Sequence, residues 1–126
     1  MSHRSRLGTL VIDCRGDDLG EAMRFWSGAL GTDCYPDPDD PRYAVTDRAP
    51  DEPHLILQKV EHDSRVHLDI ETDDKEAERV RLEALGATLV ERHPKGFVIM
   101  QAPTGQRFCL VDPQRGDFPG DAREHP

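Results

Sequence analysis

The chain consists of two similar halves. Ala29-Leu30-Gly31 and Ala84-Leu85-Gly86 each close a stretch with apolar residues at helical spacing, and the two leucines lie 55 positions apart. Each stretch opens on paired aspartates, Asp17-Asp18 and Asp73-Asp74, and lies between strand-like runs. Two copies are too few for a solenoid, so the repeat predicts two half-domains that share one core. A cleft where such halves meet is the first place to look for a ligand.

Length and charge limit the classes of protein to consider. A chain of 126 residues has the length of one domain, and we expect a single domain over residues 1–126. The net charge of −9 argues against a nucleic-acid-binding surface, which needs a basic stripe. No apolar run is long enough to span a membrane, and the N-terminus has no apolar signal region, so we expect a soluble, cytoplasmic protein. The three cysteines lack metal-like spacing and are expected to be reduced thiols.

The first half reads as strand, helix and three strands. Strands are expected at residues 7–14, 34–35, 42–46 and 54–60, and a helix from Asp17 or Asp18 to about Leu30. Within that helix Leu19, Met23, Trp26 and Leu30 recur at intervals of four, three and four, which forms one apolar stripe. Phe25 widens this stripe, so packing in the core is its expected role.

The second half repeats the order. Strands are expected at residues 65–72, 88–92, 97–102 and 107–111, with a helix between Asp73 or Asp74 and Leu85. The sequence therefore predicts an α+β fold with one module at 7–60 and a second at 65–112. Alternation of apolar and polar residues suits sheets with one face under the helices, and the other faces would enclose a cleft. The tail, 113–126, has little to bury and is expected to be frayed.

The two strand-helix-three-strand modules resemble the vicinal oxygen chelate superfamily, in its glyoxalase-like, bleomycin-resistance-like branch. The resemblance covers about residues 7–112, and no single motif in it is specific. The motifs that carry it are Ile12-Asp13-Cys14, Arg24-Phe25-Trp26, Ala29-Leu30-Gly31, Val66-His67-Leu68-Asp69-Ile70, Leu82-Glu83-Ala84-Leu85-Gly86-Ala87 and Ala102-Pro103-Thr104-Gly105-Gln106-Arg107-Phe108.

The resemblance implies a divalent metal held at four strand positions. Matched residue by residue, these positions fall on Val11, Ile56, His67 and Cys109, with the second uncertain by one residue. Val11 and Ile56 have no donor atom, and a thiol suits zinc or copper(I) better than magnesium. We therefore expect no metal and no other cofactor, with His67 as the only strong candidate ligand, while a divalent metal stays an open alternative.

Polar residues on the predicted inner face remain candidates for function. Asp13 and Asp69 occupy equivalent places in the two halves; if they approach each other, one carboxyl pKa would rise. With His67 they form a candidate acid–base group. Gln58, His67, Asp69 and Cys109 are the candidate ligand-binding residues. Structural roles stay open: His67 could simply bond Asp69 or a backbone carbonyl, Asp13 could bond the following loop, and Cys109 could be a small core residue.

Three functions fit these observations. The first is a small-molecule-binding protein with a degenerate metal site that sequesters an antibiotic or metabolite, for which the negative charge would favour a cationic ligand. The second is a lyase or isomerase acting on a carbonyl or hydroxyl compound. The third is a non-catalytic structural or regulatory dimer. The resemblance implies a homodimer, and the loops at 35–42 and 92–97 would set the ligand specificity.

Overall fold

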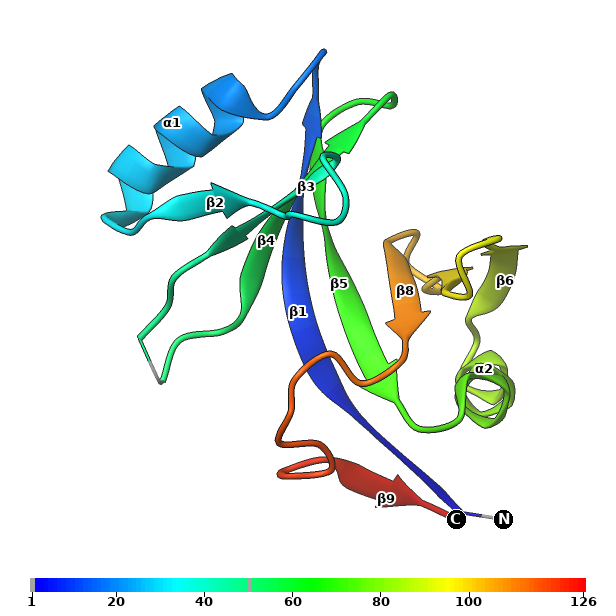
Figure 1. Cartoon of the computed structure of the whole chain (residues 1–126). Coiled ribbons are helices and arrows are strands. Elements are labelled where there is room, and N and C mark those ends of the chain that lie inside the picture. Colours follow the sequence, from blue (N-terminus) through cyan, green and yellow to red (C-terminus); the bar gives the residue numbers. More distant parts are fainter. Residues whose placement is uncertain (1, 50) are drawn as a thin grey trace. The chain divides into compact units, whose positions relative to one another are not determined.

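A computed structural model of the chain describes residues 2–49 and 51–126. The helices and strands lie in the predicted order (Figure 1). They are β1 (His3–Arg15), α1 (Gly20–Leu30), β2 (Cys34–Pro36), β3 (Tyr43–Thr46), β4 (Leu55–Val60), β5 (Arg65–Thr72), α2 (Lys75–Ala84), β6 (Thr88–Arg92), β7 (Val98–Gln101), β8 (Arg107–Val111) and β9 (Arg123–His125). Both strand-helix-three-strand modules are present, so the predicted α+β fold is confirmed.

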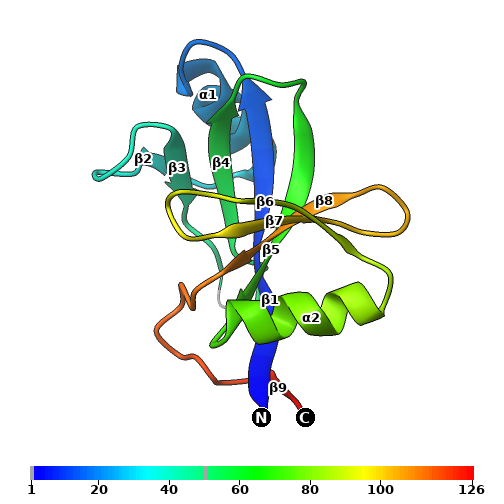
Figure 2. The same ribbon diagram turned by 90° about the vertical axis from the view of Figure 1, so that its right-hand side faces the viewer.

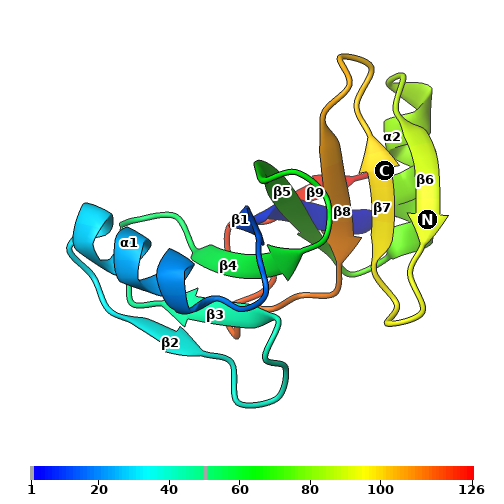
Figure 3. The same ribbon diagram turned by 90° about the horizontal axis from the view of Figure 1, so that it is seen from above.

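One compact unit comprises residues 9–67. Its strands run in the order β2-β3-β4-β1, with β1 and β4 parallel and the other neighbours antiparallel. Helix α1 lies along one side of β3 and β4 (Figure 3). The core on this side contains Leu19, Ala44 and Leu57, against which Ile12 and Cys14 pack. Because side chains alternate along a strand, Val11 and Asp13 point to the opposite face of β1.

The other compact unit comprises residues 1–8 and 68–126. Its strands follow the order β5-β8-β7-β6, with β5 and β8 parallel. Helix α2 packs beside β6 and β8 (Figure 2). Val98, Met100 and Leu110 form the centre of the core, and Ile70 packs against them. Asp69 therefore points away from this core by the same alternation.

The helix termini follow the sequence signals in part. Asp74 is the N-cap of α2, and its side chain accepts a hydrogen bond from the amide of Ala77, as the paired aspartates predict. At α1 the helix begins after Leu19, and Asp18 Oδ1 accepts from the amide of Gly20 at 2.8 Å. Gly31 ends α1 in the left-handed region with φ of 67°, which confirms the predicted stop.

The C-terminal tail is held in place, so the prediction of a frayed tail is wrong. Its last residues form β9, which pairs antiparallel with the start of β1 through His3↔His125 and Ser5↔Arg123. Arg6 is buried and donates to Asp117 and Asp121 at 2.9 and 3.0 Å. The sequence signal failed because the tail is held by ion pairs and a strand ladder instead of apolar burial.

Phe25 also differs from expectation. Its side chain is 62% exposed and meets Trp26 edge to face, with ring centroids 5.0 Å apart, whereas Trp26 packs against the core of residues 9–67. Helical spacing places Phe25 beside the apolar stripe, but the sheet reaches only the Trp26 side. Among the residues that the structure describes, no helix is both long and apolar enough to cross a membrane.

Candidate functional site

A hydrogen bond between Asp13 of β1 and His67 of β5 is the centre of the candidate site. His67 Nδ1 lies 2.9 Å from Asp13 Oδ2, and the side chains are 11% and 2% exposed. A carboxylate can only accept, so the imidazole donates through Nδ1. In the neutral ring the lone pair then lies on Nε2, which is the nitrogen suited to bind a proton or a ligand.

Two further side chains lie close to the buried carboxylate. Arg65 Nε is 3.7 Å and His62 Nε2 3.9 Å from Asp13 Oδ2. His62 donates through Nδ1 to the Asp63 carbonyl at 2.7 Å and accepts from Arg65 at 3.2 Å, so its Nε2 carries the lone pair. Arg65 is therefore the positive charge that balances Asp13. Within the described part of the chain, Asp13 Oδ1 has no hydrogen-bond partner.

Sequence reasoning missed Arg65 and His62. Arg65 precedes His67 by two residues, so strand alternation alone places both on one face of β5 and would have indicated it. His62 lies in the turn between β4 and β5, and no periodic signal places a turn side chain. Asp13 bonds His67 and not the following loop, whereas the expected approach of Asp13 to Asp69 stays a prediction.

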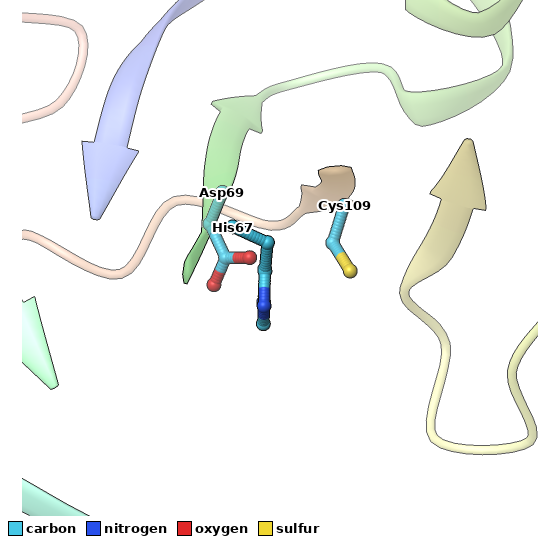
Figure 4. Close-up of side chains that lie close together, drawn as sticks. All are labelled: His67, Asp69 and Cys109. Atoms are coloured by element: carbon cyan, nitrogen blue, oxygen red, sulfur yellow. The ribbon is translucent and has the colours of Figure 1, made fainter. Parts of the chain in front are cut away.

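Cys109 of β8 lies beside the polar face of β5. It pairs with Asp69 in the parallel ladder, and Asp69 follows His67 by two residues on one continuous strand. Figure 4 draws the three side chains together, and one ligand atom from each lies within 4.8 Å of the others. Nitrogen, carboxylate oxygen and sulfur form a donor set that suits zinc better than magnesium, so a metal ion is compatible with these residues.

The ladder registers correct one of the family positions. Cys109 pairs with Asp69, and the counterpart of Asp69 in the first half is Asp13. Asp13 pairs with Gln58, whereas Ile56 pairs with Val11. The counterpart of Cys109 is therefore Gln58 and not Ile56, two residues further along β4. The sequence could not fix this register because residues 54–60 carry no motif shared with 107–111.

The family's four-ligand metal site does not fit this chain. Gln58 offers an amide oxygen and His67 an imidazole, but Val11 is buried, at 1% exposure, and has no donor. Cys109 replaces an oxygen donor with a thiol, which disfavours a hard ion. What remains is the smaller group of His67, Asp69 and Cys109.

Cys14, Cys34 and Cys109 are thiols and form no disulfide in the described part of the chain. Burial, followed by the charge of Asp13, raises the pKa of the Cys14 thiol above its usual value. A raised pKa keeps a thiol protonated at neutral pH, so Cys14 is unsuited to nucleophilic chemistry. Cys14 also packs under α1, on the face of β1 opposite Asp13.

Comparison with known proteins agrees with the fold. A family model described as a glyoxalase-like domain matches residues 9–111. No curated protein matches the chain.

Solved structures share the fold at low sequence identity. Methylmalonyl-CoA epimerase from Mycobacterium tuberculosis is 19% identical with a TM-score of 0.57, over 86% of this chain and 88% of that one. A hypothetical protein from Bacillus halodurans is 12% identical with a TM-score of 0.56, over 88% and 97%. A variant of homoprotocatechuate 2,3-dioxygenase from B. fuscum is 17% identical with a TM-score of 0.57, over 89% of this chain but 33% of that one. Since the family model covers most of its length, the chain belongs to the glyoxalase-like domain family.

Proposed function

We propose that the protein binds a small polar organic molecule on the sheet face that carries Asp13 and His67. The single observation behind this proposal is the hydrogen bond from His67 Nδ1 to a carboxylate that is 2% exposed. Burial of a carboxylate costs free energy unless the carboxylate is paired. A buried, paired carboxylate on the sheet face opposite the helix therefore favours a role in binding. A histidine whose ring is fixed in this way presents Nε2 in one orientation.

The neighbouring charges favour a ligand that carries carbonyl, carboxylate or hydroxyl oxygens. Arg65 is 47% exposed in its side chain and borders Asp13, so its guanidinium is accessible to a ligand oxygen. Gln58, Asp69 and Cys109 are further binding residues in this proposal, with Gln58 supplying an amide. Sequestration of a metabolite or antibiotic is the simplest biological use of such binding.

The same hydrogen bond favours a second candidate, an isomerase or lyase. His67 Nε2 would remove a proton from a carbon next to a carbonyl group, and the imidazolium so formed would be stabilised by Asp13. The planar enolate would then turn in the site, and the imidazolium of His67 would return the proton to its other face, which completes an epimerisation with no change in composition. Asp69 is the third acid–base residue in this proposal. A structural neighbour is named methylmalonyl-CoA epimerase, which supports this class of chemistry.

No step of either proposal passes through a metal ion. Val11 occupies the family's first ligand position and has no donor atom. The site around His67 is therefore proposed to act without a bound hard cation. If zinc binds to His67, Asp69 and Cys109, it would polarise a ligand oxygen. Elemental analysis of the purified protein distinguishes the cases, because stoichiometric zinc would contradict the metal-free proposal.

The binding proposal is tested by thermal unfolding with a panel of 2-hydroxy acids, 2-oxo acids and acyl thioesters. A ligand at a hundred times its dissociation constant stabilises the protein by about 2.7 kcal/mol, which raises the Tm by roughly 10 °C for a domain of this size. The His67→Ala variant should lose this shift, and His93→Ala, which removes a histidine stacked on Phe97 in another loop, should keep it. A panel without any shift would overturn the proposal.

Proton transfer is tested by incubation of the stabilising compound in D2O. Exchange of the hydrogen next to its carbonyl, followed by NMR, should require both His67 and Asp13. Binding without exchange would contradict the isomerase or lyase proposal and support sequestration. A homodimer and a cytoplasmic location complete the proposal, and sedimentation of a monomer at high concentration would refute the former.

A further inference from the structure

A pocket that neither Asp13 nor His67 lines lies within the unit of residues 9–67. It has a volume of about 320 Å³ and lies where α1 begins. Leu19, Met23 and Ala44 form its apolar lining, and all three belong to the core cluster under α1. Neither Asp13, His67 nor Gln58 lines it, so this pocket is separate from the candidate site described above.

The outer wall of this pocket is held in shape by its own hydrogen bonds. Pro36 and Pro41 line the pocket at the two ends of the loop between β2 and β3. The Asp37 amide donates to the Tyr43 carbonyl at 2.9 Å, and the Tyr43 amide donates to the Asp40 carbonyl at 3.1 Å. Proline fixes the backbone further, so the loop loses little conformational freedom when a ligand enters.

Most of the charged side chains at residues 17–18 and in the loop 36–43 are carboxylates. Asp18 lines the pocket and is exposed, and Asp17 precedes it. Asp37 and Asp39 lie in the neighbouring loop. Arg42, the one arginine of residues 36–43, forms an ion pair with Asp40 at 2.9 Å. These carboxylates attract a cation toward the pocket.

We propose that this pocket binds a small organic cation with an apolar body. Asp18 would face the positive charge, and Tyr43 offers an aromatic ring against which an ammonium group is stabilised. Met23 is flexible and adapts to an aryl or alkyl group. A water molecule occupies about 30 Å³ in the liquid, so the pocket volume accommodates roughly ten non-hydrogen atoms.

The probe for this proposal is benzyltrimethylammonium, and N,N-dimethylbenzamide is the neutral compound of similar size. Titration is followed through the backbone amide signals of the whole chain by NMR. We expect saturable shifts at residues 18–23 and 36–44, and weaker binding of the amide. Asp18→Asn keeps an oxygen to accept from Gly20 but removes the charge, so it should weaken binding of the cation about fivefold.

Asp17→Asn is the matched control, because it removes the same charge one residue away from the pocket lining. It should change the affinity less than twofold, and His67→Ala should leave it unchanged, which separates this pocket from the proposed function. If Asp17→Asn and Asp18→Asn weakened binding of the cation equally, the proposal would be overturned, because the affinity would then depend on the net negative charge and not on Asp18 in the pocket. Shifts centred on β1 and β5, or an absence of saturation, would overturn it as well.

Discussion

Glu78 of α2 provides a quantitative test of the electrostatics in the unit of residues 1–8 and 68–126. Its side chain is fully buried and accepts hydrogen bonds from Arg81 at 2.8 and 2.9 Å. His3 Nε2 lies 2.8 Å from the same carboxylate. Burial alone would raise the pKa of Glu78, but the hydrogen bonds from Arg81, His3 and Ser5 outweigh it and lower the pKa from 4.5 to about 2.

This lowered pKa links stability to pH. At neutral pH the carboxylate is ionised in the folded and unfolded chain, and the full stabilisation of about 3 kcal/mol is present. As the pH falls below 4.5 the unfolded chain takes up a proton first, so the contribution decreases to about 1 kcal/mol at pH 3. It is lost once the pH falls through the folded pKa near 2.

Urea unfolding of the wild type and Glu78→Gln at pH 7, 5, 4 and 3 measures this dependence. The difference in free energy of unfolding should shrink by about 2 kcal/mol between pH 7 and pH 3. Glu76→Gln is the control on the same helix; its side chain is 57% exposed and pairs with Arg79, so screening keeps its effect below about 1 kcal/mol. A difference between wild type and Glu78→Gln that stays constant from pH 7 to pH 3 would refute the reasoning.

Two further substitutions probe the tail and the core. Arg6→Met leaves the buried Glu71 without its closest charge partner, so it should destabilise the protein by about 3–5 kcal/mol and expose residues 113–122 to protease cleavage. A cleavage pattern that stays unchanged would contradict the account of the tail. Asp117→Asn is the control, because Asp117 is an exposed partner of Arg6, and this variant should keep nearly the full stability. Leu57→Ala creates a cavity beneath α1 at a fully buried position and should cost about 2–5 kcal/mol in urea unfolding; a cost below 1 kcal/mol would mean that this core is loosely packed.

The repeat in the sequence predicts the fold because both halves carry their own local signals. Asp74, Gly31 and the alternating strand at 65–72 each specify a terminus or a face from neighbouring residues alone. The tail could not be predicted in this way. Arg6 meets Asp117 across 111 positions of sequence, and no local pattern in a stretch rich in proline, glycine and charge encodes that pairing.

Strand alternation predicts that Asp13 and His67 lie on inward faces, but the prediction included neither their hydrogen bond nor the neighbouring Arg65 and His62. The alternating pattern gives Asp13 and His67 as inward residues, yet the symmetry between the halves favours a contact of Asp13 with Asp69. In the structure His67 Nδ1 donates to Asp13, and Arg65 supplies the positive charge near this carboxylate. Register is likewise a property of the folded ladder, which is why Gln58 was not identified as the counterpart of Cys109.

The most direct test of the proposed site is the tautomer of His67, read from the nitrogen chemical shifts and long-range couplings of its ring by NMR at pH 7.5. Donation to Asp13 fixes the proton on Nδ1 and leaves Nε2 with the lone pair, and Asp13→Ala should release this preference. A wild-type ring protonated on Nε2, or one unaffected by Asp13→Ala, would contradict the arrangement on which both proposed activities depend.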